Sequence, residues 1–488
     1  MDLYHERGKI GLNIQMKSDT MKKFLPFVLP TLIFLVLILI FKFNGLYGQD
    51  SHEYYRYTKD IIKFLGGGPL PANFHWPVFY PLLGALLSIL IPDPVFSLQL
   101  ISFVSFLLTI SIVSKILKMI DIEGNLDYYI LTTLSLSPFM LLYSSVVMTD
   151  LLSIFFLTGA IYFYFKYSAT KKEYHFYLFV LFTGFAFMTR YAAVVLLIIP
   201  VVLILIKFFI PFKRSKLISL LIAAVITFIC LAPHFYLKSG TSTALEDLQI
   251  RHWDLGNFLK SSFSTDEGFS THFVPNIIFV FSNFVHPYYI FLGTVLLFLF
   301  RKKDLKFPAV QISFLILILF AFFMAGFPFQ NKRHLLLSFP FVIIVLYQPF
   351  QRALNLLRRN KFFLNAAIVI LCTMQIGIFY YAFNKIYKLN LIEKRVATEL
   401  SNYNNKVLYT FFISPSLRSY EVNKKIISLY DEKITSFVKD GLVLFNEQKF
   451  KVQWENSNPM INWNYLKEHY QLIKLKSFDE GWELYEIE

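Results

Sequence analysis

The chain has 488 residues, of which 56% are hydrophobic, 18% are aromatic and only 16% are charged. Soluble domains carry about 25% charged residues, so the composition excludes a mainly soluble protein. The formal net charge is +15, but the Lys and Arg residues stand in short clusters between apolar runs. This distribution is typical of a membrane topology signal and not of a nucleic-acid-binding face. We therefore expect membrane lipids, and no nucleic acid, as partners.

Apolar runs recur along the first 384 residues, and a membrane-spanning helix needs roughly 20 such residues. The predicted spans are Phe24–Phe43, Val95–Leu117, Tyr128–Val147, Leu151–Phe165, Tyr174–Met188, Ala192–Ile210, Leu217–Leu237, Asn276–Phe300, Pro308–Phe327, Leu335–Tyr347 and Phe362–Phe383. The first span could imitate a signal peptide. It is long and bulky and lacks a small-x-small cleavage site, so we interpret it as an uncleaved span. The sequence predicts an all-α polytopic membrane protein with about 11 transmembrane helices.

The stretch Val78–Ile91 is apolar but short, and Pro92 and Pro94 follow it. We interpret it as an interfacial or re-entrant helix. With the N-terminus in the cytoplasm, the alternate loops between the other spans then collect most of the basic residues, as the positive-inside rule requires. A span at Val78–Ile91 would invert every later loop and place most basic clusters outside.

This topology predicts two long outer loops, residues 44–94 and 238–275, and an outer tail. Residues 1–384 form the predicted transmembrane domain. Residues 385–488 are polar and rich in Lys and Asn, with short apolar runs, and the alternation from Trp482 to Ile487 is typical of a strand. The tail is large enough for a small α/β extracytoplasmic domain.

Acidic and histidine side chains follow the first span directly, in Asp50-Ser51-His52-Glu53-Tyr54. A carboxylate at a low-dielectric boundary can act as a general base, although an ordinary polar helix flank would look the same. The rigid stretch His75-Trp76-Pro77-Val78-Phe79-Tyr80-Pro81 comes before the predicted interfacial helix. Its prolines and aromatic residues indicate a loop that lies against the membrane.

Asp150 stands at a turn with almost no linker between two spans. An acid at the edge of the hydrocarbon is costly unless it is paired or solvated, which makes it a candidate functional residue. The alternative is a capping role at a helix N-terminus, which Thr149 and Asp150 both suit. The topology places Asp150 on the same outer face as Asp50.

Several cations share that face. They are Arg190, Arg333 with His334, and Arg251 in the second outer loop. The forked donors of Arg suit phosphate, but an Arg at an interface can equally extend to lipid headgroups. Within the second outer loop, the spacing of His and acidic residues matches no metal-binding motif.

The order of these motifs resembles the GT-C glycosyltransferases of the protein O-mannosyltransferase and lipid A aminoarabinose transferase type. The corresponding stretches are Asp50–Tyr54, Trp76–Pro81, Ser137-Pro138 leading to Thr149-Asp150, and Arg333-His334-Leu335 leading to Pro340. The family often has adjacent Asp-Glu, whereas Ser51 and His52 separate Asp50 from Glu53 here. Either carboxylate could therefore be the base. His334 stands where the family usually has an aromatic residue.

The resemblance implies transfer of a sugar from a polyprenyl-phosphate donor to a lipid, glycan or protein acceptor, on the outer face of the bacterial plasma (inner) membrane. The implied catalytic residues are Asp50, Glu53 and Asp150, with Asp50 as the preferred base. Asp150 could orient the acceptor or hold a divalent metal ion. The implied substrate-binding residues are His52, Tyr54, His75, Arg190, Arg251, Arg333 and His334, with Arg190 and Arg333 stabilising the departing lipid phosphate.

Three other classes remain as alternatives. A transporter would predict charged residues within spans and an internal repeat, and neither is evident in the sequence. A membrane acyltransferase or polysaccharide ligase would need a site centred on His or Ser, and His234, His286 and His334 are scattered. A membrane scaffold without catalytic activity is the third alternative.

Overall fold

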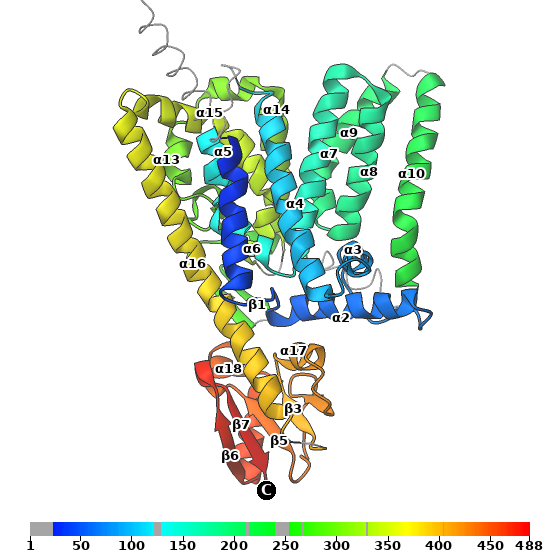
Figure 1. Ribbon diagram of the computed structural model, residues 1–488, viewed down its shortest axis with the longest axis vertical. Helices are drawn as coiled ribbons and strands as arrows, with labels where there is room; N and C mark the ends of the chain where they lie inside the picture. Colours follow the sequence, from blue (N-terminus) through cyan, green and yellow to red (C-terminus); the bar gives the residue numbers. More distant parts are fainter. Residues whose placement is uncertain are drawn as a thin grey trace, which may run out of the picture.

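The computed structural model describes residues 23–121, 128–210, 214–239, 253–265, 268–327, 330–403 and 405–488. The chain forms a bundle of helices and a small domain below it that contains a sheet (Figure 1). One hydrophobic core fills the bundle, and a second, separate core fills the small domain.

The helices of the bundle make the chain an integral membrane protein. Among the described residues, six helices are long and apolar enough to cross a membrane: Pro94–Leu117, Asp150–Thr170, Lys216–Lys238, Pro308–Ala325, Lys332–Leu357 and Lys361–Leu400. Shorter apolar helices cover Lys23–Leu39, Phe79–Ser88 and Ala193–Phe209. The predicted helical membrane fold is therefore confirmed, while the predicted number of spans stays a prediction.

Around the bundle, the chain runs through a series of long helices. They are α4 (Pro94–Leu117), α7 (Asp150–Thr170), α8 (Glu173–Thr189), α9 (Ala193–Phe209), α10 (Arg214–Lys238), α14 (Pro308–Ala325) and α15 (Phe339–Leu357). Short 3-10 turns lie between them: η2 (Leu255–Leu259), η3 (Lys302–Lys306) and η4 (Lys332–Ser338). A two-stranded antiparallel hairpin, β1 (Ser262–Thr265) with β2 (Gly268–Thr271), lies in the second predicted outer loop.

Two of the predicted spans are not continuous helices. Tyr128–Val147 divides into α5 (Tyr128–Ser135) and α6 (Pro138–Ser145). Asn276–Phe300 divides into α11 (Asn276–Phe279), α12 (Ser282–Val285) and α13 (Gly293–Phe298). Pro138 and Pro287 stand at the breaks, and proline lacks the amide hydrogen that a helix interior requires. A hydropathy pattern alone does not detect such breaks, because the residues on both sides of each break are apolar.

The first predicted outer loop is largely helical. It contains α2 (Gly48–Leu65) and α3 (Phe79–Ser88), and α2 lies across the lower ends of the upright helices in Figure 1. The short α3 falls within Val78–Ile91, the stretch predicted to form a short helix. One side of α2 is buried against the bundle and the small domain, and its buried residues are Ser51, His52, Tyr54, Tyr57, Thr58 and Ile61.

Helix α16 (Lys361–Leu400) connects the two parts of the molecule. It leaves the bundle and continues into the small domain (Figure 1), where residues from Ile392 onward join the second core. The boundary predicted near residue 384 therefore falls inside one continuous helix. The interface between the domains is consequently built on a stiff element and not on a loop.

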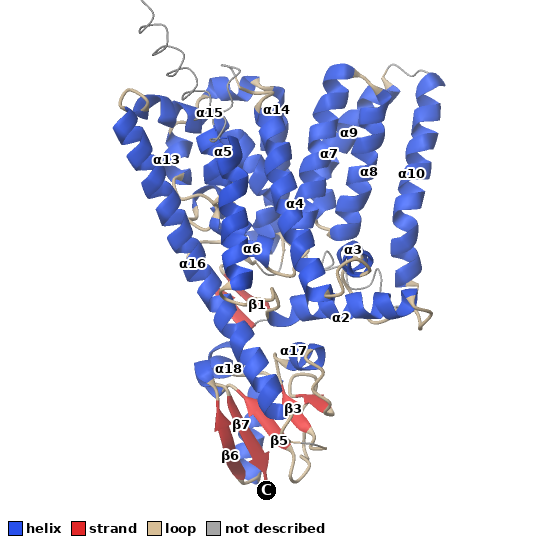
Figure 2. Ribbon diagram, in the orientation of Figure 1, coloured by secondary structure: helices blue, strands red, loops and turns tan. Residues whose placement is uncertain are grey.

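The small domain has the α/β composition that the sequence indicated. Its sheet has the strand order β4-β3-β5-β7-β6, in which β3 pairs in parallel with β4 and β5 while β7 pairs antiparallel with β5 and β6 (Figure 2). The strands are β3 (Leu408–Thr410), β4 (Ile426–Ser428), β5 (Leu442–Phe445), β6 (Leu472–Ser477) and β7 (Glu483–Ile487). The other elements are α17 (Ser414–Ser419), α18 (Glu447–Trp454), α19 (Asn458–His469) and η5 (Asp479–Gly481). Helix α17 packs beneath α2 (Figure 1).

Candidate active site

The segment that leads into α2 is fixed to the segment that leads into α7. Val147 N donates to the Gly45 carbonyl oxygen over 2.9 Å. The Gln99 side-chain amide donates to the Ser145 carbonyl oxygen over 2.7 Å and to that of Phe43 over 3.3 Å. Gly45 has φ +76°, and a Cβ there would lie 2.8 Å from the Ser145 oxygen, so this close approach requires glycine. The two predicted acidic positions therefore stand next to each other.

The first turn of α2 presents Asp50 at this junction. The Ser51 hydroxyl donates to the Tyr47 carbonyl oxygen over 2.5 Å and accepts from Tyr47 N over 2.7 Å, which fixes the start of the helix. Residues four apart share a helix face, while residues two apart point in nearly opposite directions. Tyr54 therefore shares the face of Asp50, and His52 points away from it.

Asp150 is the first residue of α7, and its side chain is fully buried. A helix N-terminus favours a negative charge, but a buried carboxylate also needs direct partners. Arg190, the C-cap residue directly after α8, forms an ion pair with Oδ1 of Asp150. Arg333 Nε donates to its Oδ2 over 3.0 Å. Both carboxylate oxygens of Asp150 are thus held by arginines.

Arg333 joins the two acidic positions. It lies in η4, where the Asn331 side chain accepts from its backbone amide over 2.9 Å. Its Nη1 donates to Asp50 Oδ2 over 2.8 Å, and its Nη2 reaches Met148 Sδ at 3.0 Å. The guanidinium also lies 5.7 Å from the centre of the Tyr143 ring. We refer to Asp50, Asp150, Arg190 and Arg333 as the carboxylate–arginine cluster.

Two further predicted residues border this cluster. Tyr54 is buried, and burial together with the charge of Asp50 raises the pKa of its hydroxyl well above the ordinary value. Tyr54 therefore keeps its proton and can serve as a donor. His334 is close enough to interact electrostatically with Arg190, Arg333 and Asp150.

Other predicted site residues have different neighbours. Glu53 accepts from Arg56 Nε over 2.8 Å. The exposed ring of His75 lies against Trp76 with 6.1 Å between the ring centres. His52 is buried between α16 and α17, where it contacts Glu393 and Ser419. Arg251 lies outside the described residues.

The charges of the cluster balance, with two carboxylates facing two guanidinium groups. Its exposure is uneven, because the Asp50 side chain is 32% exposed while those of Arg190 and Arg333 are 17% and 13% exposed. A thioether is a weak acceptor, so the contact of Arg333 Nη2 with Met148 leaves a strong donor poorly used. The arrangement can accept an anion at the guanidinium groups and a proton at Asp50.

A divalent metal ion does not fit this donor set. Arg333 lies between the two carboxylates that would be its ligands, and both oxygens of Asp150 face arginines. Within the described ranges, no three His, Cys, Asp or Glu side chains gather as a set that could hold a metal.

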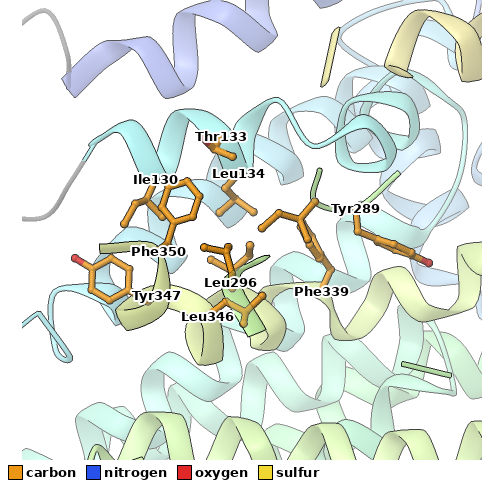
Figure 3. Close-up of a pocket in the computed structure, with 11 residues that line it drawn as sticks. Ile130, Thr133, Leu134, Tyr289, Leu296, Phe339, Leu346, Tyr347 and Phe350 are labelled. Atoms are coloured by element: carbon orange, nitrogen blue, oxygen red, sulfur yellow. The ribbon is translucent and has the colours of Figure 1, made fainter. Parts of the chain in front are cut away.

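A small cavity lies inside the bundle between α5, α13 and α15 (Figure 3). Its lining is apolar apart from the hydroxyls of Thr133, Tyr289 and Tyr347, and it includes no carboxylate or cation. The Tyr289 hydroxyl donates to the Lys332 carbonyl oxygen, next to Arg333. Tyr289, which lines the cavity, therefore contacts η4 from within the bundle.

Sequence reasoning missed several residues that contact the predicted ones. Met148 and Tyr143 contact Arg333, and both look like ordinary apolar-run residues in the sequence. Glu393 and Ser419 contact His52, although they lie about 340 and 370 residues after it in the sequence. Glu393 lies in the polar, Lys-rich tail, where one more acidic residue gives no signal of its own.

The fold as a whole is similar to that of ArnT from Cupriavidus metallidurans. The match to its apo structure has a TM-score of 0.62 at 10% identity and covers 93% of this chain and 97% of that chain. The match to ArnT bound to undecaprenyl phosphate has a TM-score of 0.61 at 11% identity and covers 94% and 97%. An oligosaccharyltransferase from Archaeoglobus fulgidus matches with a TM-score of 0.48 at 13% identity over 94% and 72%.

No family model and no curated protein matches the sequence. The likeness to ArnT spans both the bundle and the small domain, because it covers nearly all of both chains. The predicted resemblance to the lipid A aminoarabinose transferase type is confirmed at the level of the fold.

Proposed function

We propose that this protein is a membrane glycosyltransferase that transfers a sugar from a polyprenyl-phosphate donor to an acceptor hydroxyl. One observation carries the proposal: Arg333 divides its donors among Asp50, Asp150 and the weakly accepting sulfur of Met148. A guanidinium held in this way can turn part of its fork to a phosphate, for which its geometry is suited. The ArnT-like fold and the ArnT complex with undecaprenyl phosphate support the same donor class.

The proposed reaction is a displacement at the anomeric carbon of the donor. The acceptor oxygen forms a bond to that carbon, and the bond from the carbon to the phosphate oxygen breaks. The acceptor proton passes to Asp50, and the bonding electrons leave with the polyprenyl phosphate. Arg190 and Arg333 stabilise the charge that grows on the leaving phosphate, and such preorganised groups contribute most where charge develops.

The neighbours of the two candidate bases favour Asp50 over Glu53. Glu53 is held by Arg56, which also donates to Asp60 and to the Asn73 carbonyl oxygen. Asp50 is held by Arg333 and is partly exposed. When a donor phosphate draws Arg333 away, Asp50 gains a free oxygen beside the reacting carbon.

The positive-inside distribution supports an extracytoplasmic site in the bacterial plasma membrane. The cluster, α2 and the small domain all lie at one end of the bundle (Figure 1). An acceptor lipid, glycan or protein would then approach from that side.

The proposal is tested with purified protein in lipid nanodiscs and radiolabelled undecaprenyl-phosphate sugars. We expect the wild type to release undecaprenyl phosphate from at least one of these donors. The Asp50→Asn variant should lose at least about 100-fold in turnover, because removal of a general base costs 10²–10⁴-fold.

Asp60→Asn is the matched control, since Asp60 lies on the same helix and pairs with Arg56 over 2.8 Å. It should keep wild-type turnover. No release from any donor by folded wild-type protein, or full activity of Asp50→Asn, would contradict the proposal. Loss of activity in Glu53→Gln with full activity in Asp50→Asn would move the base to Glu53.

A further inference from the structure

Three parts of the molecule meet at the side chain of His52. Its Nδ1 lies 2.5 Å from the Ser419 hydroxyl at the end of α17, and its Nε2 lies 3.0 Å from Glu393 Oε2 on α16. The Tyr420 ring packs edge-on against the imidazole with 5.5 Å between the centres. The side chains of His52 and Glu393 are 0% and 2% exposed. We refer to His52, Glu393 and Ser419 as the domain junction.

The hydrogen bonds of the domain junction limit which of its side chains can donate and which can accept. The Ser419 hydroxyl also lies 2.9 Å from the Ser416 carbonyl oxygen, and a hydroxyl has one proton to donate. When Ser419 donates to His52 Nδ1, the imidazole is neutral and donates from Nε2 to Glu393. When Ser419 donates to Ser416, both imidazole nitrogens donate and His52 is an imidazolium paired with Glu393. Either pattern satisfies the ring, and losing the ring would leave a buried carboxylate unpaired, which is costly.

Other contacts align the same elements. The Asn390 side-chain amide on α16 donates to Asn44 Oδ1 over 2.8 Å and to the Leu46 carbonyl oxygen over 2.6 Å. These two acceptors lie in the segment just before α2. Lys59 on α2 pairs with the exposed Glu421 just after α17 over 3.0 Å. The small domain and α16 therefore hold α2 at its start and along its length.

Asp50 and His52 belong to the same helical turn. A turn of α-helix is rigid on the scale of a side chain, so a shift of the His52 backbone moves the Asp50 carboxylate as well. His52 faces the small domain while Asp50 faces Arg333. The turn is thus clamped between the domain junction on one side and the carboxylate–arginine cluster on the other.

We propose that the domain junction is a positioning device, through which the docked C-terminal domain sets the place of the Asp50 carboxylate in the reaction. His52 is then a positioning residue that touches no substrate. This inference rests on the proposed function for its kinetic part only. Misplacement of a reacting group by about 1 Å costs about 100-fold in rate, so the junction would act on the rate of the chemical step and not on donor binding.

The test compares three substitutions in the full-length protein. His52→Leu removes both hydrogen bonds, while His52→Gln keeps a side chain that can donate to Glu393 and accept from Ser419. Lys59→Leu is the matched control, because it removes the exposed contact of the same interface. We expect His52→Leu to lower kcat at least about tenfold with the KM for the donor unchanged. His52→Gln should recover most of that loss, and Lys59→Leu should match the wild type.

Amide hydrogen exchange gives a second readout that needs no activity. In His52→Leu, the amides of the first two turns of α2 should exchange at least about tenfold faster, while those of α4 and α7 stay unchanged. If the wild type turns over no donor, the proposed function fails, and this exchange pattern still tests the junction.

Three results would overturn the inference: wild-type kcat and exchange in His52→Leu, a rise in KM with kcat unchanged, or equal effects from Lys59→Leu. Ser419→Ala covers the case in which His52→Leu does not fold, because it keeps the pair of His52 with Glu393. It should lower kcat in the same direction by about threefold. Unchanged kcat and unchanged exchange in α2 for that variant would also overturn the inference.

Discussion

Two arginine–carboxylate clusters lie near the two ends of α15, and they are built differently. In the C-terminal half of α15, Arg352 donates from Nη1 and Nη2 to the two carboxylate oxygens of Asp304 over 2.8 and 2.5 Å. Its Nη2 also donates to the Leu299 carbonyl oxygen over 2.6 Å. Just before its start, Arg333 shares its donors among two carboxylates and a sulfur atom.

The difference indicates that one group stabilises the fold and that the other is arranged to bind a ligand. The Arg352 fork meets one carboxylate in the bidentate arrangement that uses its donors best. Asp304 also accepts from the Arg301 amide over 2.9 Å, so its partners close a local loop. Arg333 instead draws together segments that lie far apart in sequence, and it retains a poorly used donor. We infer that the Arg352 pair stabilises the fold and that the Arg333 group performs the chemistry.

The largest effect should come from breaking the cluster at Arg190. Arg190→Ala removes one of the two cations that would face the leaving phosphate. Turnover of the donor should fall by about 10²–10³-fold, the cost of losing one preorganised charge-stabilising group. Arg352→Ala, assayed at the same concentration of folded protein, should keep turnover within about twofold. An equal loss in both variants would remove the distinction between the two clusters.

The second largest effect should be a loss of thermal stability when the pair of Arg352 and Asp304 is broken. Arg352→Leu leaves the nearly buried Asp304 without its charged partner, and breaking a buried pair costs about 3–5 kcal/mol. Thermal unfolding in detergent should show a clear fall in Tm. A Tm equal to that of the wild type would mean that the Arg352 pair does not hold the fold.

The smallest effect should come from the exposed pair of Lys59 and Glu421, which shows how little a solvent-exposed ion pair changes the Tm. The hydrogen bond from Lys59 and its charge lower the pKa of Glu421 below its ordinary 4.5. Because the folded pKa is the lower one, the pair contributes stability above pH 4.5 and loses it as the pH falls through the folded pKa. The Tm difference between wild type and Glu421→Gln should be small at about pH 7 and vanish in acid. A difference that grows in acid would reverse this assignment.

The members of the carboxylate–arginine cluster could be predicted because the basic residues of the loops indicate which side of the membrane each loop faces. Asp50, Asp150, Arg190 and Arg333 could each be assigned to one face from the basic residues between spans. Their direct contacts depend on long-range packing, such as the approach of Gly45 to Ser145, which no local pattern encodes.

Other features could not be predicted for similar physical reasons. Hydropathy does not register the breaks at Pro138 and Pro287, since apolar residues continue on both sides. The side of α2 that His52 faces follows from helical periodicity, but its partners on α16 and α17 come from a domain more than 300 residues away. The sequence therefore grouped His52 with Asp50, while the structure places the two on opposite faces of one turn.

The most direct test of the account is the affinity for undecaprenyl phosphate itself, measured by microscale thermophoresis in nanodiscs. We expect Arg333→Gln to weaken this binding by at least about tenfold, which corresponds to the loss of a charge-assisted contact worth about 1.4 kcal/mol or more. Arg352→Gln should bind as the wild type does. Equal affinity in Arg333→Gln and the wild type would contradict the claim that the carboxylate–arginine cluster receives the lipid phosphate.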